Sequence, residues 1–237
     1  MKIKIIATGS SKWERFIRRW GVSFLIGEDV LFDTFGDPGV FLNNLRKFNI
    51  DTGKIKHIVL SHDDWDHIAG LWYLIGNRKD ITVYICPGFK QEIKDRIASF
   101  GVRVVEVEPF SVIKEGVFSS GQIESFCVGK TIFEQVLVIK FLTNLSIIAG
   151  CAHPGIINII DVVQGHFLKE QVYSVLGGLH LKDNSREVNL DVIEKLRGAG
   201  IRKIVPMHCT GKQATRMIRE RFGFGFVRAK EGDSIEL

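Results

Sequence analysis

The segment His62-Asp63-Asp64-Trp65-Asp66-His67 constrains this chain more than any other feature, because two imidazoles and three carboxylates fall within six residues. It follows the short apolar stretch Ile58–Leu60, which predicts a strand. In an extended loop, residues i and i+2 point the same way, so His62 and Asp64 could hold one metal ion. Asp66 and His67 could then reach a second ion. Helix capping is the alternative, but it would explain one aspartate and neither histidine.

Five of the seven histidines share a setting, since each follows a short apolar stretch in a loop that contains Gly, Pro or Ser. These five are His62, His67, His153, His180 and His208. Loops at strand ends are where the sites of α/β proteins are assembled, so we expect one metal site from these loops. His57 and His166 lie outside this pattern and are expected to be surface or partly packed residues.

Cys151 and Cys209 lie close in sequence to His153 and His208. Thiolates are good zinc ligands. A lone cysteine at a buried strand end is more often a small apolar filler. The predicted ligand set therefore leaves both cysteines out.

Strand and helix signals alternate along the 237 residues, and 45% hydrophobic with 25% charged residues is an ordinary globular composition. The middle of the chain, from residue 112 to 149, instead predicts successive antiparallel strands. We expect an α/β fold with two packed sheets, helices outside, and one domain over residues 1–237. The predicted helices are Pro38–Phe48, His67–Ile75, Phe89–Phe100, Pro154–Val163, Asn189–Arg197 and Lys212–Phe222.

Several classes of protein do not fit the composition. The four cysteines show no Cys-x-x-Cys spacing, which indicates a reducing compartment, and we expect a cytoplasmic protein. We predict no signal peptide and no membrane span, because no apolar run approaches ~18 residues. The net charge of +5 mildly favours a small anionic ligand over nucleic acid.

These motifs resemble the metallo-β-lactamase superfamily, whose signature is His-x-His-x-Asp-His. Here Asp64 stands in the place of the second histidine. The resemblance extends to Asp33, His153 and His208 and covers nearly the whole chain. It implies an αββα sandwich of two mixed β-sheets with helices on the outer faces.

Three further segments are similar to a branch of metal-dependent hydrolases within this superfamily. They are Gly150–Ile156, Gly177–Leu181 and Met207–Gly211. The branch includes an archaeal dihydropterin–ribofuranosylaminobenzene phosphate synthase. A transferase reaction of that pterin type is therefore an alternative to hydrolysis.

The resemblance implies the roles of the site residues. His62, Asp64 and His153 would hold one metal ion, and Asp66, His67 and His208 would hold the other. Zinc is the expected metal, with manganese or iron as alternatives. The two ions would share a water and present hydroxide as the nucleophile, so Asp66 also counts among the catalytic residues. Asp33 would orient a ligand from behind.

Many superfamily members place a bridging aspartate after the strand that is predicted here at Val172–Leu176, and this chain has His180 instead. With Asp64 gained and the bridge lost, Asp64 and Asp66 would keep the number of carboxylates at two. His180 would be a ligand, a general acid that stabilises the transition state, or a packed residue. We favour the general acid.

Three functions follow from these motifs. The first is metal-dependent hydrolysis of a small phosphodiester or ester, the second is the pterin-type transfer, and the third is metal or ligand binding without catalysis. The stretch from Ser10 to Trp20 is basic and aromatic, and it suits either a phosphorylated ligand or a dimer contact. The oligomeric state is left open.

Overall fold

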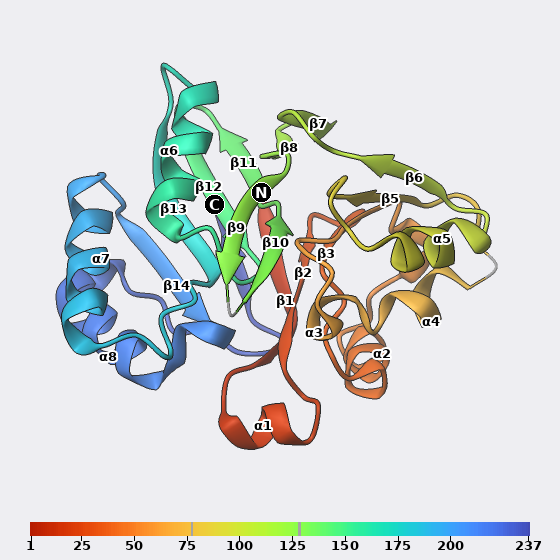
Figure 1. Cartoon of the computed structure of the whole chain (residues 1–237), viewed down its shortest axis with the longest axis horizontal. Helices are drawn as coiled ribbons and strands as arrows, with labels where there is room; N and C mark the ends of the chain where they lie inside the picture. The colour runs from red at the N-terminus through yellow and green to blue at the C-terminus, as the bar shows by residue number, and fades with distance from the viewer. Residues whose placement is uncertain (77, 128) are drawn as a thin grey trace.

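Two mixed β-sheets lie face to face between two layers of helices in the computed structural model, which describes residues 1–76, 78–127 and 129–237 (Figure 1). The αββα sandwich expected from the sequence is confirmed. The first sheet has the order β15 (Ser234–Glu236), β1 (Lys2–Gly9), β2 (Gly21–Ile26), β3 (Val30–Phe32), β4 (His57–Val59), β5 (Thr82–Ile85) and β6 (Arg103–Glu106). The second has the order β14 (Lys203–Met207), β13 (Gln171–Gly178), β12 (Asn144–Ala149), β11 (Leu137–Phe141), β8 (Val117–Ser119) and β7 (Ser111–Lys114).

Each sheet combines a parallel and an antiparallel part. Strands β3 to β6 run parallel in the first sheet, and β12, β13 and β14 run parallel in the second. Strands β11, β8 and β7 pair antiparallel in the second sheet. The sequence predicted antiparallel strands for this middle part of the chain. Because parallel strands end at one edge, the loops that follow β4, β12, β13 and β14 are the ones that can share a site.

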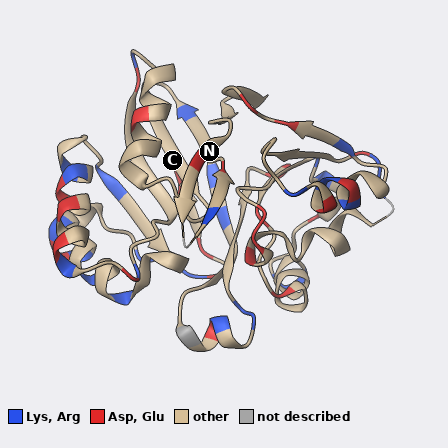
Figure 2. Cartoon of the chain, in the orientation of Figure 1, with Lys and Arg blue, Asp and Glu red and all other residues tan. Residues whose placement is uncertain are grey.

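Three apolar clusters hold the four layers together. The central cluster joins the sheets through residues such as Phe24 and Phe32 of the first sheet and Leu176 of the second, all fully buried. The outer clusters pack helices onto the sheets. Helices α2 (Pro38–Lys47), α4 (Leu71–Ile75) and α5 (Gln91–Ser99) cover the first sheet, while α6 (Ile156–His166), α7 (Arg186–Gly198) and α8 (Gly211–Phe222) cover the second. Many of the charged residues lie on α5, α7 and α8 (Figure 2).

The predicted helix His67–Ile75 is two short helices, α3 (Trp65–Ile68) and α4, with Gly70 between them. A Cβ at position 70 would lie 2.3 Å from the Thr34 carbonyl oxygen and 2.6 Å from the Phe41 ring, so close packing requires glycine there. Helix α3 begins two residues earlier than predicted. Asp64 occupies its N-cap position, but its side chain makes no capping hydrogen bond. The carboxylate of Asp64 is thus not used as a cap.

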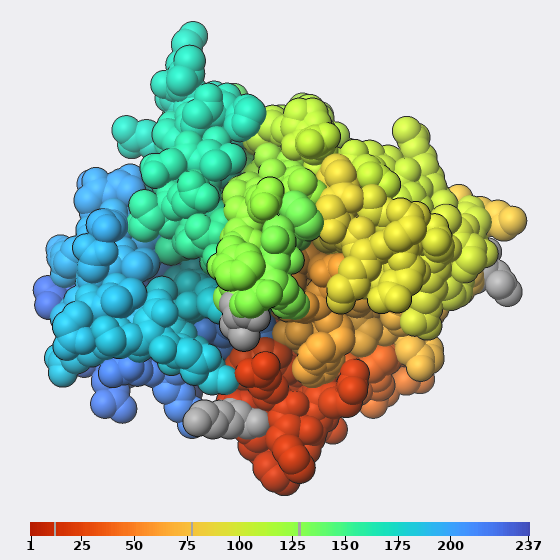
Figure 3. Space-filling view, viewed as in Figure 1, coloured from red at the N-terminus to blue at the C-terminus, as the bar shows by residue number. Residues whose placement is uncertain are grey.

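One helix and one hairpin of two strands were missed. Helix α1 (Lys12–Phe16) begins with a capping box between Ser11 and Glu14. Strands β9 (Ile123–Cys127) and β10 (Lys130–Glu134) form a separate antiparallel hairpin, coloured green at the centre of Figures 1 and 3. Exposed side chains separate the buried ones along it, but the sequence there shows no clear alternation of apolar and polar residues. Among the described helices, none is both long and apolar enough to cross a membrane.

Candidate metal centre

The five histidines singled out from the sequence lie together at the carboxyl ends of four strands. His62 follows β4, His153 follows β12, His180 follows β13 and His208 follows β14. Their rings form a chain of neighbours: the ring centroids are 4.1 Å apart for His62 and His67, 4.7 Å for His62 and His153, 5.2 Å for His67 and His208, and 4.5 Å for His153 and His180. The other two histidines lie elsewhere, since His57 contacts Tyr84 and His166 stacks on Phe110.

Four of these rings are held by the protein through the same atom, Nδ1. The partners are Ser61 Oγ for His62 at 2.8 Å, Asp33 Oδ2 for His67 at 2.6 Å, Glu134 Oε2 for His153 at 2.9 Å and the Gly9 carbonyl for His208 at 2.9 Å. When Nδ1 donates to such a partner, Nε2 carries the free lone pair. Metal-binding histidines show this arrangement almost without exception.

Asp33 lies directly behind His67. Both side chains are fully buried, and the Asp33 carboxylate also accepts hydrogen bonds from the Ser61 backbone and hydroxyl, both at 2.7 Å. Asp33 has a φ of 57°, a left-handed conformation that costs energy for a residue with a Cβ. The chain therefore tolerates strain at the position that fixes the His67 ring.

Glu134, at the end of the hairpin, is the functional residue that the sequence analysis missed. Its fully buried carboxylate accepts hydrogen bonds from the backbone amides of Cys151, Ala152 and His153, and from the His153 ring. Burial alone would raise the pKa of Glu134, but the hydrogen bond from His153 and the charge of His62 hold it below its usual value. Its role depends on hydrogen bonds to a loop seventeen to nineteen residues later in the chain, which spacing in the sequence does not show.

One ring nitrogen provides a test of whether these residues suit a cation. Nε2 of His62 is buried and has no hydrogen-bond partner among the described residues. Such an orphaned polar atom is costly, and buried polar groups are nearly always satisfied. Its nearest charged neighbour is the Asp64 carboxylate, 3.8 Å away. A metal ion bound there would satisfy it, so the donor set fits the metal that the sequence implied.

Asp66 faces two of the histidines with one oxygen. Its Oδ2 lies 3.3 Å from His67 Nε2 and 3.5 Å from His208 Nε2. Burial alone would raise the pKa of Asp66, but the charges of His67 and His208 hold it well below the usual value. Asp66 is therefore an anionic donor directed between two imidazole nitrogens.

Asp64 is placed differently, at the rim of the site. One oxygen lies 2.6 Å from Nζ of Lys130 on the hairpin, and the other faces His62. The Lys130 ion pair therefore competes with a metal ion for this carboxylate.

Cys151 occupies the middle of the cluster rather than its margin. Its Sγ lies 3.5 Å from His67 Nε2 and 3.2 Å from His208 Nε2. Donor atoms of Cys151, His62 and His153 lie within 4.8 Å of one another, and so do those of Cys151, His67 and His208. The same residue thus belongs to both groups of possible metal donors, which spacing in the sequence did not reveal.

His180 lies at the mouth of the site, with a left-handed φ of 49°. Its backbone amide contacts Cys209 Sγ at 3.3 Å, and its Nε2 lies 3.7 Å from Cys127 Sγ on the hairpin. The interaction with Cys209 raises the pKa of His180, while burial opposes the rise. Cys151, His180 and Cys209 also form a third group of donor atoms within 4.8 Å.

A cavity of about 330 Å³ opens onto these residues. His62, Asp64, Asp66 and His153 line it, and His67 and His208 lie behind its wall. Three basic side chains, those of Arg15, Lys130 and Lys182, and one further carboxylate, that of Asp183, complete the charged lining. Trp20 forms part of its wall, with Lys182 Nζ 4.4 Å and the Arg15 guanidinium 5.9 Å from the indole ring. The mouth of the site is therefore both basic and aromatic.

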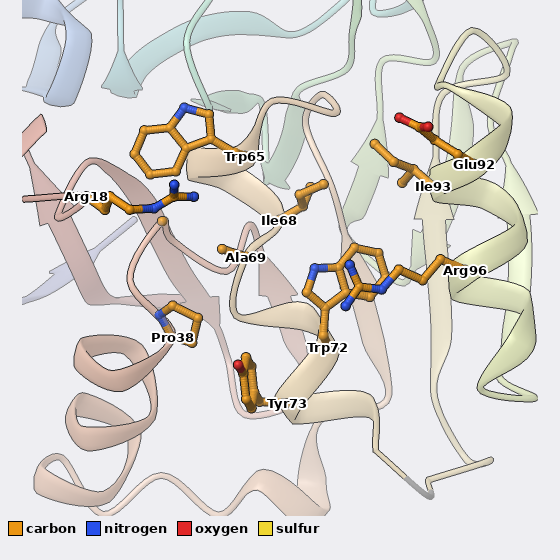
Figure 4. A pocket seen from close by; sticks show the side chains of 11 residues that line it. Arg18, Pro38, Trp65, Ile68, Ala69, Trp72, Tyr73, Glu92, Ile93 and Arg96 are labelled. Atoms are coloured by element: carbon orange, nitrogen blue, oxygen red, sulfur yellow. The ribbon is translucent and has the colours of Figure 1, made fainter. Parts of the chain in front are cut away.

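A second cavity of about 580 Å³ adjoins the first through Trp65, which lines both (Figure 4). Arg18 stacks on Trp65 at 4.7 Å, and Arg96 stacks on Trp72 at 3.9 Å. None of the candidate metal donors lines this larger cavity. The chemistry of the site is thus confined to the smaller cavity.

Comparisons with known proteins indicate the family and the fold of this chain. Residues 28–126 match the family described as the beta-lactamase superfamily domain. The chain is 29% identical to the 7,8-dihydropterin-6-methyl-4-(beta-D-ribofuranosyl)-aminobenzene-5'-phosphate synthase of Methanocaldococcus jannaschii, over 93% of this chain and 91% of the relative. It is 31% identical to an uncharacterized protein of the same organism, over 95% of this chain and 97% of the relative.

A solved structure matches the whole chain as well. The crystal structure described as a metal-dependent hydrolase of the beta-lactamase superfamily superposes with a TM-score of 0.80 at 26% identity. The match covers 100% of this chain and 99% of that one.

Proposed function

Because the chain belongs to the metallo-β-lactamase superfamily, we propose that it is an enzyme that uses two divalent metal ions to hydrolyse a small phosphorylated or otherwise anionic ester. The observation that carries the proposal is the set of four histidines whose Nδ1 atoms are all held by the protein. Where Nδ1 donates to its partner, as beside the carboxylates behind His67 and His153, Nε2 is left available as a donor. Nδ1 of His208 is contacted both by the Gly9 carbonyl and by the Gly21 amide.

The donors divide into two groups in this proposal. His62, Asp64 and His153 hold one ion, and Asp66, His67 and His208 hold the other. Imidazole and carboxylate donors suit zinc, and they also accept manganese or iron. When bound, such ions supply Lewis acidity and lower the pKa of water.

The remaining residues of the cavity bind and orient the substrate. Arg15, Lys130 and Lys182 attract an anionic group to the mouth, and Trp20 provides a flat apolar wall. His180 holds a proton at the edge of the site and donates it to the leaving group. Its raised pKa favours the protonated form that this role requires.

A second candidate function is a pterin-type transfer. It is favoured by the full-length similarity to a synthase whose product is a pterin joined to a phosphorylated ribofuranosyl aminobenzene. A basic and aromatic cavity suits such a phosphorylated aromatic substrate as well as it suits a small ester.

Hydrolysis of bis-p-nitrophenyl phosphate by protein loaded with zinc or manganese tests the first candidate. We expect turnover by the loaded protein and none after chelation or in a His62→Ala/His153→Ala double variant. Absence of hydrolysis by protein that carries its metal, together with formation of a dihydropterin–ribofuranosylaminobenzene phosphate product, would favour the transferase instead.

A further inference from the structure

Four atoms in the second half of the site form a ring in which each lies close to the next. They are Asp66 Oδ2, His67 Nε2, Cys151 Sγ and His208 Nε2. The Asp66 oxygen lies 3.3 and 3.5 Å from the two nitrogens, and the Cys151 sulfur lies 3.5 and 3.2 Å from them. The side chains that carry these atoms are all buried.

These four distances are close to those between neighbouring donors around a zinc ion. With Zn–N and Zn–O distances near 2.1 Å, tetrahedral angles place nitrogen and oxygen donors about 3.4 Å apart. With Zn–S near 2.3 Å, sulfur and nitrogen donors lie about 3.6 Å apart. The sulfur of Cys151 therefore lies at donor spacing from both imidazole nitrogens, in contact with polar atoms.

We propose that the thiolate of Cys151 is the fourth protein donor to the metal ion that Asp66, His67 and His208 hold. This inference rests on the proposed metal-dependent function and names a donor outside the ligand set implied by the family signature. The donor group that supports it contains Cys151, His67 and His208, whose donor atoms all lie within 4.8 Å of one another.

The local fold places the sulfur where this role requires it. Glu134 accepts a hydrogen bond from the Cys151 backbone amide at 2.9 Å, which fixes the loop after β12. At the end of β13, a Cβ on Gly178 would lie 2.3 Å from the Gly150 carbonyl, 2.6 Å from Cys209 Sγ and 3.2 Å from Cys151 Cα. No side chain fits at position 178, so the last residue of this strand supplies no donor, and the loop that carries Cys151 packs directly against the strand end.

Donation by Cys151 also bears on the charge of the site. Asp64, which was expected to replace the charge of the lost bridging carboxylate, lies at the rim and pairs with Lys130. A thiolate in the centre of the cluster supplies a second anionic donor next to Asp66. It also makes the second metal position softer than a nitrogen and oxygen shell would be.

X-ray absorption spectroscopy of the zinc-loaded protein tests the proposal. We expect the wild-type spectrum to contain a sulfur shell at about 2.3 Å, with nitrogen and oxygen donors at about 2.0–2.1 Å. In Cys151→Ser the sulfur shell should disappear. Cys209→Ser and Cys86→Ser are matched controls, because both remove another buried thiol, and both should keep the sulfur shell.

The outcomes separate this proposal from the function on which it rests. Zinc bound by nitrogen and oxygen alone in the wild type would overturn the assignment of Cys151 and leave the metal-dependent hydrolase in place. A sulfur shell that is lost in Cys209→Ser and kept in Cys151→Ser would show that Cys209 is the sulfur donor, and it would overturn the assignment of Cys151. Failure of the wild type to bind zinc, manganese or iron would instead contradict the proposed function, and binding of manganese or iron without zinc would overturn the assignment of Cys151 to a zinc site. The wild-type spectrum is informative even if Cys151→Ser does not fold.

Discussion

Nδ1 of His153 lies 2.9 Å from Oε2 of Glu134, a carboxylate that is fully buried and belongs to a different strand pair. A carboxylate in this position fixes the tautomer of the imidazole, because it can only accept a hydrogen bond. Nε2 of His153 is thereby left without a proton. The hairpin that carries Glu134 thus prepares a donor atom of the site.

Glu134→Gln should weaken metal binding without removing any metal donor. The amide group would face two N–H donors of His153, which either leaves buried donors unpaired or forces the ring into the other tautomer, with its proton on Nε2. We expect metal affinity at the first position to fall about 10- to 100-fold. Titration with zinc under competition from a chelator measures this.

Glu124→Gln is the control for that experiment, because Glu124 is exposed on the same hairpin. It should leave metal affinity unchanged. Equal affinities for the wild type and Glu134→Gln would show that the buried carboxylate has no part in preparing His153.

Asp64→His should shift metal preference toward zinc. The change replaces an oxygen donor with an imidazole, the residue found at this position in the superfamily signature, and it also releases Lys130. Competition between zinc and manganese, followed by elemental analysis, measures the preference. Asp63→His is the neighbouring control and should change nothing. An unchanged metal profile and unchanged activity in Asp64→His would mean that Asp64 is not a ligand.

His180→Ala distinguishes the three roles that the sequence left open. If His180 donates a proton to the leaving group, both metal ions and substrate affinity should be kept while turnover falls about 10²–10³-fold. If it is a ligand, metal content should fall at one position. If it only packs, the melting temperature should fall while metal content and turnover stay near the wild-type values, and this outcome would refute the role we assign to it.

Lys182→Ala should weaken substrate binding more than catalysis. Lys182 lines the mouth of the cavity and lies over Trp20 without contacting a candidate metal donor. Loss of one charge-assisted hydrogen bond, about 1.5 kcal/mol, should raise KM for an anionic ester roughly tenfold with kcat little changed. Lys90→Ala, on the exposed surface, is the control. A fall in kcat alone would contradict a binding role.

The fold was largely predictable because its strands are short, apolar and followed by polar loops. Helix and strand periodicity predicted the alternating parts of both sheets, and the polar residues after β4, β12, β13 and β14 predicted where the loops meet. The hairpin of β9 and β10 was missed. Its apolar and polar residues alternate less clearly than those of the strands in the two sheets. In addition, no helix follows the hairpin to mark its boundary.

The candidate site was predictable only in part, since sequence spacing shows which residues share a loop and not which atoms meet. His62, His67, His153 and His208 were recognised from their positions after strands. Glu134 was missed because its role depends on tertiary hydrogen bonds to a loop seventeen to nineteen residues away. Cys151 was set aside because burial alone does not distinguish a filler thiol from a donor.

The number of metal ions bound to each chain tests the central claim most directly. Elemental analysis of protein that is grown and purified with zinc or manganese, free of chelators, should give two ions per chain. The His62→Ala/His153→Ala double variant should keep about one, because the donors around Asp66 remain. A folded wild-type protein that carries no metal under these conditions would contradict the account.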